Sequence, residues 1–258
     1  MYYDTLPTLN PRKAKVLLLH GNGQSAHTFQ AKMRFLHEPI ARAITTPPSI
    51  THQDVYSGAV DFVYLDAPIP ASQIDRGQES RNGKEASPDR LIDSWVWGDG
   101  DPENGEIIGV ETVLARLTRV LDEQGPFMGI IGFSEGAAWA MVLCGLLERQ
   151  AKALTGLHTN HPPLQFGIAF SGLRFEHESY RWMYTPKIKT PVLHFMGTLD
   201  TLVTEQQTLK LIEACENPTI QYFEGTHYIP RRPEIQKRIT DYIQQALVWS
   251  HGAVIERK

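Results

Sequence analysis

The feature that most constrains the fold is an alternation of short apolar runs with longer segments that have helical spacing. Strands that are buried on both faces read as continuous apolar runs rather than as alternating patterns. Because these runs alternate with helices, the sequence predicts an α/β fold with a mostly parallel central sheet and helices on both faces. The predicted strands are residues 15–20, 60–65, 127–131, 164–170, 191–196 and 219–223, and the predicted helices are residues 25–44, 105–123, 135–149, 205–215 and 233–248.

Three of the predicted helices carry further expectations. Pro39 should interrupt the helix over residues 25–44, because proline lacks the backbone N–H that a helix interior needs. The helix over residues 105–123 should place Ile108 with its other apolar residues on one face. The helix over residues 135–149 is apolar nearly all round, so we expect it to be deeply packed.

Residues 69–104 show no clear periodicity and form the longest irregular segment of the sequence. Long loops inside compact domains are uncommon and are usually functional or mobile. Trp95 and Trp97 lie near the end of this segment. We therefore expect one domain over residues 1–258 with an insertion at about 69–104, which is either a solvated loop or a lid or pocket wall.

The sequence IGFSEGAAW at residues 131–139 contains the pattern Gly-x-Ser-x-Gly. A predicted strand precedes Ser134 and a predicted helix follows it, so Ser134 lies on a sharp strand-to-helix turn. At such a turn, side chains two positions before and after the serine would clash, and Gly132 and Gly136 remove those clashes. The pattern predicts that Ser134 is a nucleophile, if an acid and a base are also present.

Asp200 and His227 each follow a predicted strand, where they can reach toward the tip of a neighbouring strand. Asp200 could also be an ordinary turn or N-cap aspartate, and the chain has ten histidines. The chain order Ser134, Asp200, His227 is the order found in α/β-hydrolases. In that geometry His227 accepts the proton of Ser134, and Asp200 fixes the tautomer of the imidazole.

An oxyanion hole should complete such a site. One donor should be the backbone N–H of Glu135, which follows the nucleophile. The second should come from the turn HGNG at residues 20–23, with the backbone of Asn22 as the first choice and that of Gly23 as the rival. His20 follows four apolar residues and is expected to brace this turn from a buried position rather than to react.

Other kinds of site have weaker support. The turn at residues 20–23 does not continue into a dinucleotide-binding glycine pattern. No cluster of His, Cys and Asp has the spacing of metal ligands, so we expect no metal. His194 lies inside an apolar strand and Cys144 lies on the packed helix, so both are expected in the core.

Composition narrows the class of protein. The net charge is −4 and no Lys/Arg cluster is present, which argues against a nucleic-acid partner. The first residues lack the apolar core of a signal peptide and no run of 18 apolar residues occurs, so we expect no membrane partner. Cys144 and Cys215 are far apart in sequence and are expected to be free thiols, which favours the cytoplasm.

With these residues placed, the chain resembles the fungal family of serine hydrolases, within the α/β-hydrolase fold. That family includes the ovarian-cancer-associated serine hydrolase of animals and the thioesterase that releases the lovastatin side-chain polyketide. The resemblance extends over about residues 15–243 and rests on VLLLHGNGQSAHTF, VYLDAP, GFSEGAA, HFMGTLDTLV and FEGTHYIP. It implies a cofactor-free hydrolase of esters or thioesters that uses Ser134, Asp200 and His227. The chain departs from the family pattern at Glu135, where many relatives have Gln, and at Thr226, where many have Gly.

The expected function is hydrolysis of an acyl ester or thioester through an acyl-enzyme on Ser134. The resemblance favours release of a polyketide-type acyl chain from a carrier protein in secondary metabolism. A general carboxylesterase for short or medium acyl chains is the alternative. An acyltransferase that excludes water and a non-catalytic receptor with this fold are less favoured. Aromatic candidates for the acyl pocket, each of which could equally belong to the core, are Trp95, Trp97, Phe175 and Tyr228.

Overall fold

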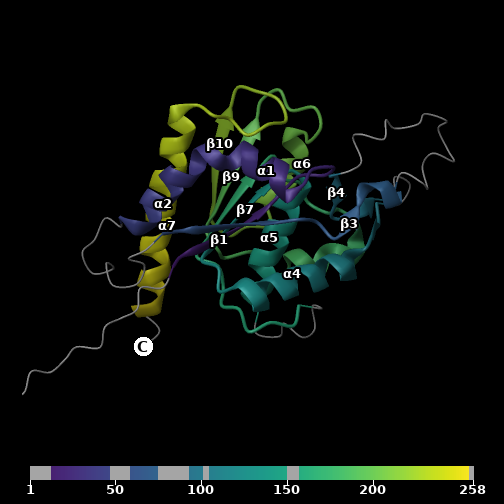
Figure 1. Cartoon of the computed structure of the whole chain (residues 1–258), viewed down its shortest axis with the longest axis horizontal. Coiled ribbons are helices and arrows are strands. Elements are labelled where there is room, and N and C mark those ends of the chain that lie inside the picture. The colour runs from purple at the N-terminus through teal and green to yellow at the C-terminus, as the bar shows by residue number, and fades with distance from the viewer. Residues whose placement is uncertain (1–12, 47–58, 75–92, 101–104, 150–156, 256–258) are drawn as a thin grey trace, which may run out of the picture.

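The computed structural model describes residues 13–46, 59–74, 93–100, 105–149 and 157–255. Its main element is a six-stranded sheet in which every neighbouring pair of strands is parallel (Figure 1). The six predicted strands and the parallel sheet are thereby confirmed. In spatial order the strands are β10 (Pro218–Phe223), β9 (Val192–Gly197), β8 (Phe166–Phe170), β7 (Gly129–Phe133), β1 (Lys15–Leu19) and β2 (Asp61–Leu65).

The strand order reverses between β1 and β7. Along the chain, β1 is the first strand of the sheet. The chain then passes to the edge strand β2 and returns to β7, on the other side of β1. Leu19 at the end of β1 is paired with both Leu65 and Gly132, so these strand ends lie at one level of the sheet. Ligands of open α/β sheets bind beyond the carboxyl ends of the strands at such a reversal.

Helices cover both faces of the sheet, and the alternation of side chains along β1 shows why. Leu17 and Leu19 point into one apolar cluster, and Val16 and Leu18 point into another on the opposite face. Both faces of the strand therefore need a covering layer (Figure 1). The first cluster includes residues of α4 (Val110–Gln124), α5 (Glu135–Leu147) and α6 (Glu205–Ile212), and the second includes residues of α1 (Ala26–Met33), α2 (His37–Thr45) and α7 (Pro233–Ile255).

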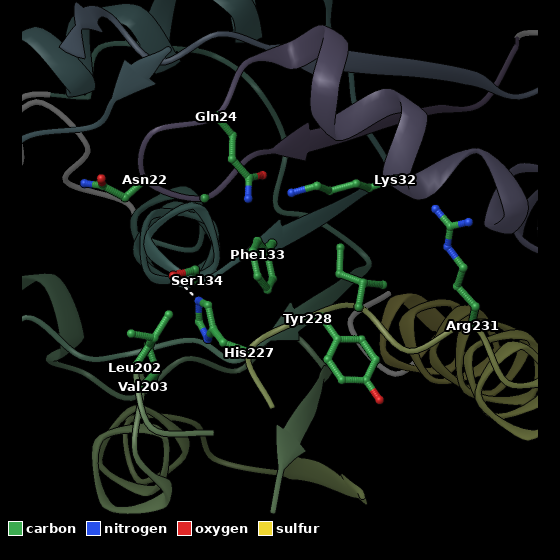
Figure 2. Close-up of a pocket in the computed structure, with 12 residues that line it drawn as sticks. Asn22, Gln24, Lys32, Phe133, Ser134, Leu202, Val203, His227, Tyr228 and Arg231 are labelled. Atoms are coloured by element: carbon green, nitrogen blue, oxygen red, sulfur yellow. Dashed lines mark hydrogen bonds between the residues drawn. The ribbon is translucent and has the colours of Figure 1, made fainter. Parts of the chain in front are cut away.

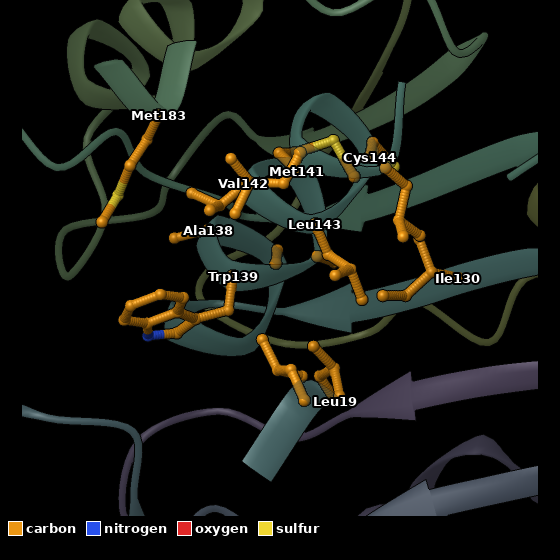
Figure 3. Close-up of a cluster of buried hydrophobic side chains, with 14 of the residues drawn as sticks. Leu19, Ile130, Ala138, Trp139, Met141, Val142, Leu143, Cys144 and Met183 are labelled. Atoms are coloured by element: carbon orange, nitrogen blue, oxygen red, sulfur yellow. The ribbon is translucent and has the colours of Figure 1, made fainter. Parts of the chain in front are cut away.

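The helix α5 is buried on all sides, as its composition predicts. Every residue from Gly136 to Leu147 is buried. Figure 3 shows side chains such as Trp139, Val142 and Leu143 projecting from different sides of this helix into the surrounding core. Because α5 begins directly after Ser134, the dense packing of α5 fixes the position of Ser134.

The first helical segment breaks in a different place from the one predicted. A short 3₁₀ helix, η1 (Arg34–Leu36), separates α1 from α2. Pro39 is instead the third residue of α2. Proline is tolerated in the first turn because the N–H groups there have no partner within the helix.

The helix predicted over residues 105–123 begins later than expected. Gly109 has φ 101°, and α4 starts at Val110. The preceding strand β6 (Ile107–Ile108) pairs antiparallel with β5 (Asp99–Gly100). Ile108 is 66% exposed, so its predicted place on the buried face of a helix is wrong.

The start of the 69–104 segment lies beside residues 95–96. The strand β3 (Ile69–Pro70) pairs antiparallel with β4 (Trp95–Val96). The N–H of Ala71 donates to the carbonyl of Ser94 at 2.9 Å. Residues 75–92 and 101–104, on which the predicted lid largely depends, lie outside the described residues. Within the described ranges, none of the helices combines the length and apolar character that a membrane crossing requires.

Candidate active site

Ser134 occupies a strained turn between β7 and α5. Its backbone has φ 55° and ψ −123°, a region that residues other than glycine rarely adopt. A Cβ atom on Gly132 would lie 2.4 Å from the carbonyl oxygen of Gly136. A Cβ atom on Gly136 would lie 2.2 Å from the carbonyl oxygen of His20. The two glycines of the motif are therefore required by the backbone that places Ser134 at the end of β7.

The structure brings Ser134, His227 and Asp200 together from the ends of three strands (Figure 2). The Nε2 atom of His227 lies 2.9 Å from Oγ of Ser134, and its Nδ1 atom lies 2.7 Å from Oδ2 of Asp200. An ionised Asp200 can only accept, so Nδ1 carries the proton and Nε2 is free to accept one from the hydroxyl. The side chains of His227 and Asp200 are 14% and 2% exposed.

Asp200 is fixed by its own loop. Its Oδ1 atom accepts hydrogen bonds from the backbone N–H groups of Leu202 and Val203, both at 3.0 Å. Burial raises the pKa of the Asp200 carboxyl, but the hydrogen bonds from Val203 and His227 outweigh burial and hold the pKa below its usual value. Asp200 is therefore ionised while it faces the imidazole. The hydrogen bonds from Leu202 and Val203 also make Asp200 a turn aspartate, the alternative role that the sequence suggested. Asp200 fills both roles, because its other oxygen contacts His227.

His20 is buried and supports the turn over residues 20–23, as predicted. Its Nδ1 atom lies 2.8 Å from the carbonyl oxygen of Gly21. Its Nε2 atom accepts the backbone N–H of Ala67 at 3.0 Å. Burial lowers the pKa of His20, so the ring is neutral and joins the end of β1 to the end of β2.

The turn after β1 comes close to Ser134. A Cβ atom on Gly21 would lie 3.3 Å from Cβ of Ser134. The N–H of Gly23 donates to the carbonyl of Trp95 at 3.0 Å, so this rival oxyanion donor is already engaged. Among the described residues, the backbone N–H groups of Asn22 and Glu135 have no acceptor in the protein. The arrangement favours Asn22 over Gly23 as the second donor.

The Glu135 side chain turns back toward the same turn. Its Oε2 atom accepts a hydrogen bond from Nδ2 of Asn22 at 3.0 Å. Burial raises the pKa of the Glu135 carboxyl to about 7, although hydrogen bonds from Asn22 and the backbone of Trp97 act in the opposite direction. The carboxyl thus joins the first residue of α5 to the turn after β1. Sequence reasoning gave this side chain no role, because nothing in the motif shows where it points.

Ser134 and His227 line a cavity of about 780 Å³, a size suited to a small organic ligand. Figure 2 shows Ser134 and His227 at one side of it and Lys32 and Arg231 at the other. The residues that line the cavity are Gly21, Asn22, Gln24, Lys32, Phe133, Ser134, Leu202, Val203, His227, Tyr228, Ile229 and Arg231.

Of the four aromatic residues predicted for the acyl pocket, only Tyr228 lines this cavity. Trp97 is wrong as a pocket residue, because it is fully buried and its Nε1 donates to the carbonyl of His20 at 2.8 Å. Phe175 is also wrong, because it lies in the core with its ring centroid 5.0 Å from that of Trp139. Trp95 packs against the same core and pairs with β3, so it does not line the cavity either.

Sequence reasoning missed the two cations of the cavity, Lys32 and Arg231. Lys32 lies in the last turn of α1, and Arg231 lies just before α7. A lysine on the polar side of a helix and an arginine in a loop are ordinary surface residues in sequence. Only the packing of these elements around the ends of the strands brings them to one cavity.

Other reactive side chains are in the core, as predicted. Burial lowers the pKa of His194 to about 3, and its Nε2 atom lies 3.6 Å from Sγ of Cys215. Cys144 is free and fully buried, and burial raises the pKa of its thiol. In the described part of the chain, no group of three His, Cys, Asp or Glu residues is placed to hold a metal ion.

A comparison with solved structures agrees with this fold. The maize acyl-protein thioesterase 2, whose crystal structure is known, superposes with a TM-score of 0.54 at 16% identity, over 91% of this chain and 95% of that one. With the parallel sheet and its covering helices, this likeness identifies the α/β-hydrolase fold.

Similar sequences include proteins that are named as serine hydrolases and esterases. "Family of serine hydrolases 2" of Saccharomyces cerevisiae is 30% identical over 89% of this chain and 97% of its own length. "Esterase OVCA2" of Xenopus tropicalis is 25% identical over 95% of this chain and 98% of its own. A "Dihydrofolate reductase" of Schizosaccharomyces pombe is 27% identical over 90% of this chain, which spans only 47% of that longer protein. The serine hydrolase (FSH1) family model matches residues 9–239, and this chain belongs to that family.

Proposed function

We propose that this serine hydrolase cleaves acyl esters or thioesters through an acyl-enzyme formed on Ser134. The observation that carries the proposal is the hydrogen-bonded series from Asp200 through His227 to Ser134, which opens into the cavity. A serine hydroxyl is a poor nucleophile until an adjacent base accepts its proton, and His227 Nε2 at 2.9 Å is within reach to do so.

In the first half of the reaction, Oγ of Ser134 attacks the acyl carbonyl carbon while Nε2 of His227 takes its proton. The negative charge that develops on the carbonyl oxygen is held by the backbone N–H groups of Asn22 and Glu135. The carbon–oxygen or carbon–sulfur bond then breaks, and the alcohol or thiol leaves with the proton from His227. Asp200 stabilises the imidazolium that exists between these two proton transfers.

In the second half, Nε2 of His227 takes a proton from a water molecule, and the hydroxide oxygen of that water attacks the acyl carbon. The bond to Ser134 then breaks, the free acid leaves, and His227 returns its proton to Ser134. No cofactor enters this scheme. Leu202, Val203 and Ile229 form an apolar part of the cavity wall that can contact an acyl chain.

At a finer level, we propose a polyketide-type acyl chain on a carrier protein as the natural substrate. The resemblance of the sequence motifs to a family that contains such a thioesterase supports this choice. We further propose that residues 1–258 act as one domain and that the segment over residues 69–104 shapes substrate access. We also propose that the protein is located in the cytoplasm, because Cys144 and Cys215 are free thiols and the cytoplasm keeps thiols reduced.

A fluorophosphonate probe tests the nucleophile. Wild type should be labelled covalently, and Ser134→Ala should not be labelled, because the probe reacts with an activated serine. Ser179→Ala is the control, because Ser179 is exposed and does not line the cavity, so its loss should leave labelling unchanged. Folded wild type that resists the probe, or Ser134→Ala that is still labelled, would refute the assignment.

The finer proposal needs a comparison of rates. Acyl thioesters on a carrier protein should be hydrolysed with a higher kcat/KM than aryl esters with the same acyl group. Equal values would leave the hydrolase assignment intact and would favour a general carboxylesterase instead.

A further inference from the structure

Two cations lie on the wall of the catalytic cavity, away from the reacting atoms. Lys32 projects into the cavity from α1, and Arg231 projects from the segment that precedes α7 (Figure 2). In the same view, Phe133 and Tyr228 lie between these cations and Ser134. The cavity therefore has a reacting end and a cationic end, with Phe133, Tyr228 and the amide of Gln24 between them.

No acidic side chain of the described chain neutralises this cationic end. The residues that line the cavity include no Asp or Glu. Among the described residues, neither Lys32 nor Arg231 forms an ion pair with a carboxylate. The guanidinium of Arg231 instead lies over the ring of Phe35, at 5.4 Å from its centroid. Partial burial lowers the pKa of the Lys32 ammonium, and no neighbouring charge offsets that cost.

These two cations are opposite in sign to the net charge of the chain. The chain has a formal net charge of −4, so a cationic cavity end does not follow from its overall composition. Two cations that have no carboxylate partner in the described chain, and that line the same cavity as Ser134, are suited to an anion that arrives with the substrate.

We propose that the cavity takes esters or thioesters that carry an anionic group, a carboxylate or a phosphate, which Lys32 and Arg231 bind while the scissile carbonyl lies at Ser134. This inference rests on the proposed hydrolase function and adds the charge of its substrate. Phe133, Tyr228 and Ile229 would contact the chain that joins the two groups. The guanidinium can bind a carboxylate or phosphate with two parallel hydrogen bonds, and the ammonium adds a second positive charge.

Two substrate pairs distinguish the possible sources of the anion. For an anion on the acyl side, the mono-p-nitrophenyl ester of glutarate is compared with p-nitrophenyl valerate, which has the same number of carbons and no charge. For an anion on the leaving group, S-butyryl-phosphopantetheine is compared with S-butyryl-pantetheine, which lacks only the phosphate. The proposal expects wild type to prefer the charged member of at least one pair.

The variants Lys32→Gln and Arg231→Gln test whether that preference arises at this site. Each should lower kcat/KM for the preferred charged substrate by about tenfold, because a hydrogen bond to a charged group is lost. Each should leave kcat/KM for the neutral partner within about twofold, which also shows that the variant is folded. Arg232→Gln is the matched control, because Arg232 is adjacent, does not line the cavity, and donates to the carbonyl of Glu224.

The outcomes separate this inference from the function on which it rests. A preference for neither charged substrate would overturn the inference, as would a loss in Lys32→Gln and Arg231→Gln that is equal for charged and neutral substrates. In both cases Ser134-dependent hydrolysis of the neutral esters would leave the proposed function standing. If no ester or thioester is hydrolysed by folded wild type, the proposed function fails and this inference fails with it.

Discussion

Replacing Glu135 by Gln should stabilise the folded protein at alkaline pH and not at acidic pH. The amide has the size of the carboxyl and keeps an oxygen that can accept from Asn22 and from the backbone of Trp97. It has no proton to lose. Burial raises the pKa of the Glu135 carboxyl from 4.5 to about 7, so the folded chain binds a proton more tightly than the unfolded chain.

The sign of the effect follows from that difference in proton binding. Below pH 4.5 the carboxyl is protonated in both states, and the wild type bears no cost. Between pH 4.5 and about 7 the folded state holds more protons than the unfolded state, so the free energy of unfolding falls as the pH rises. Above pH 7 the folded wild type carries a largely buried carboxylate, and the cost has reached its full value. Glu135→Gln removes this cost.

The size of the effect follows from the shift in pKa. A shift from 4.5 to about 7 corresponds to at most about 3.5 kcal/mol, at about 1.4 kcal/mol per unit of pKa. Because the residue keeps some contact with solvent, we expect a gain of about 1–3 kcal/mol in the free energy of unfolding at about pH 8.5, relative to the difference at about pH 4.

Urea denaturation at the two pH values, followed by tryptophan fluorescence, measures this gain, because Trp97 and Trp139 are fully buried. Glu111→Gln is the matched control. Glu111 also lies in the first turn of a helix, α4, but is exposed. A stability difference between Glu135→Gln and wild type that does not change with pH would refute the reasoning, and so would an equal gain in Glu111→Gln.

Two further predictions concern the reacting serine and its partners. Asp200→Asn should lower kcat by about 10⁴-fold with little change in melting temperature, because the amide oxygen can still accept from Leu202 and Val203 while the amide nitrogen forces His227 into the wrong tautomer. Steady-state kinetics beside thermal denaturation check this, and activity near that of wild type would place the acid elsewhere. Gly136→Ala should destabilise the protein by about 3 kcal/mol or more, because its Cβ would lie 2.2 Å from the carbonyl oxygen of His20. Gly100→Ala, which has open space around it, should have little effect in the same denaturation assay, and equal losses in the two variants would show that the turn tolerates a side chain.

The sheet and the residues at its strand ends could be predicted from sequence, because the information is local. An apolar run marks each strand, and the residue after the run must lie at the carboxyl end of the sheet. Ser134, Asp200 and His227 are all of this kind. Their meeting follows from parallel strands that end at one level, which the pattern of alternating strands and helices already implies.

The walls of the cavity could not be predicted in the same way. Apolarity in sequence does not distinguish an aromatic residue of the core, such as Trp97, from one that faces a ligand, such as Tyr228. Lys32 and Arg231 are almost 200 residues apart and meet only because α1 and α7 cover the same face of the sheet. The direction of the Glu135 side chain likewise could not be predicted, because its partner Asn22 lies in a turn that is distant in sequence.

The pairing of β3 with β4 has a consequence for how proteins of this family can diversify. Residues 69–70 are paired with residues 95–96, and Trp95 also exchanges hydrogen bonds with the turn after β1 through Gly23 and Gln24. Lengthening a loop between fixed ends costs little, about 0.6 kcal/mol for each doubling of its length. We therefore expect length changes between these paired residues to leave Ser134 and His227 in position. If the 69–104 segment shapes substrate access as proposed, selectivity can change without a change in catalysis, and a library that seeks new substrates belongs in this segment.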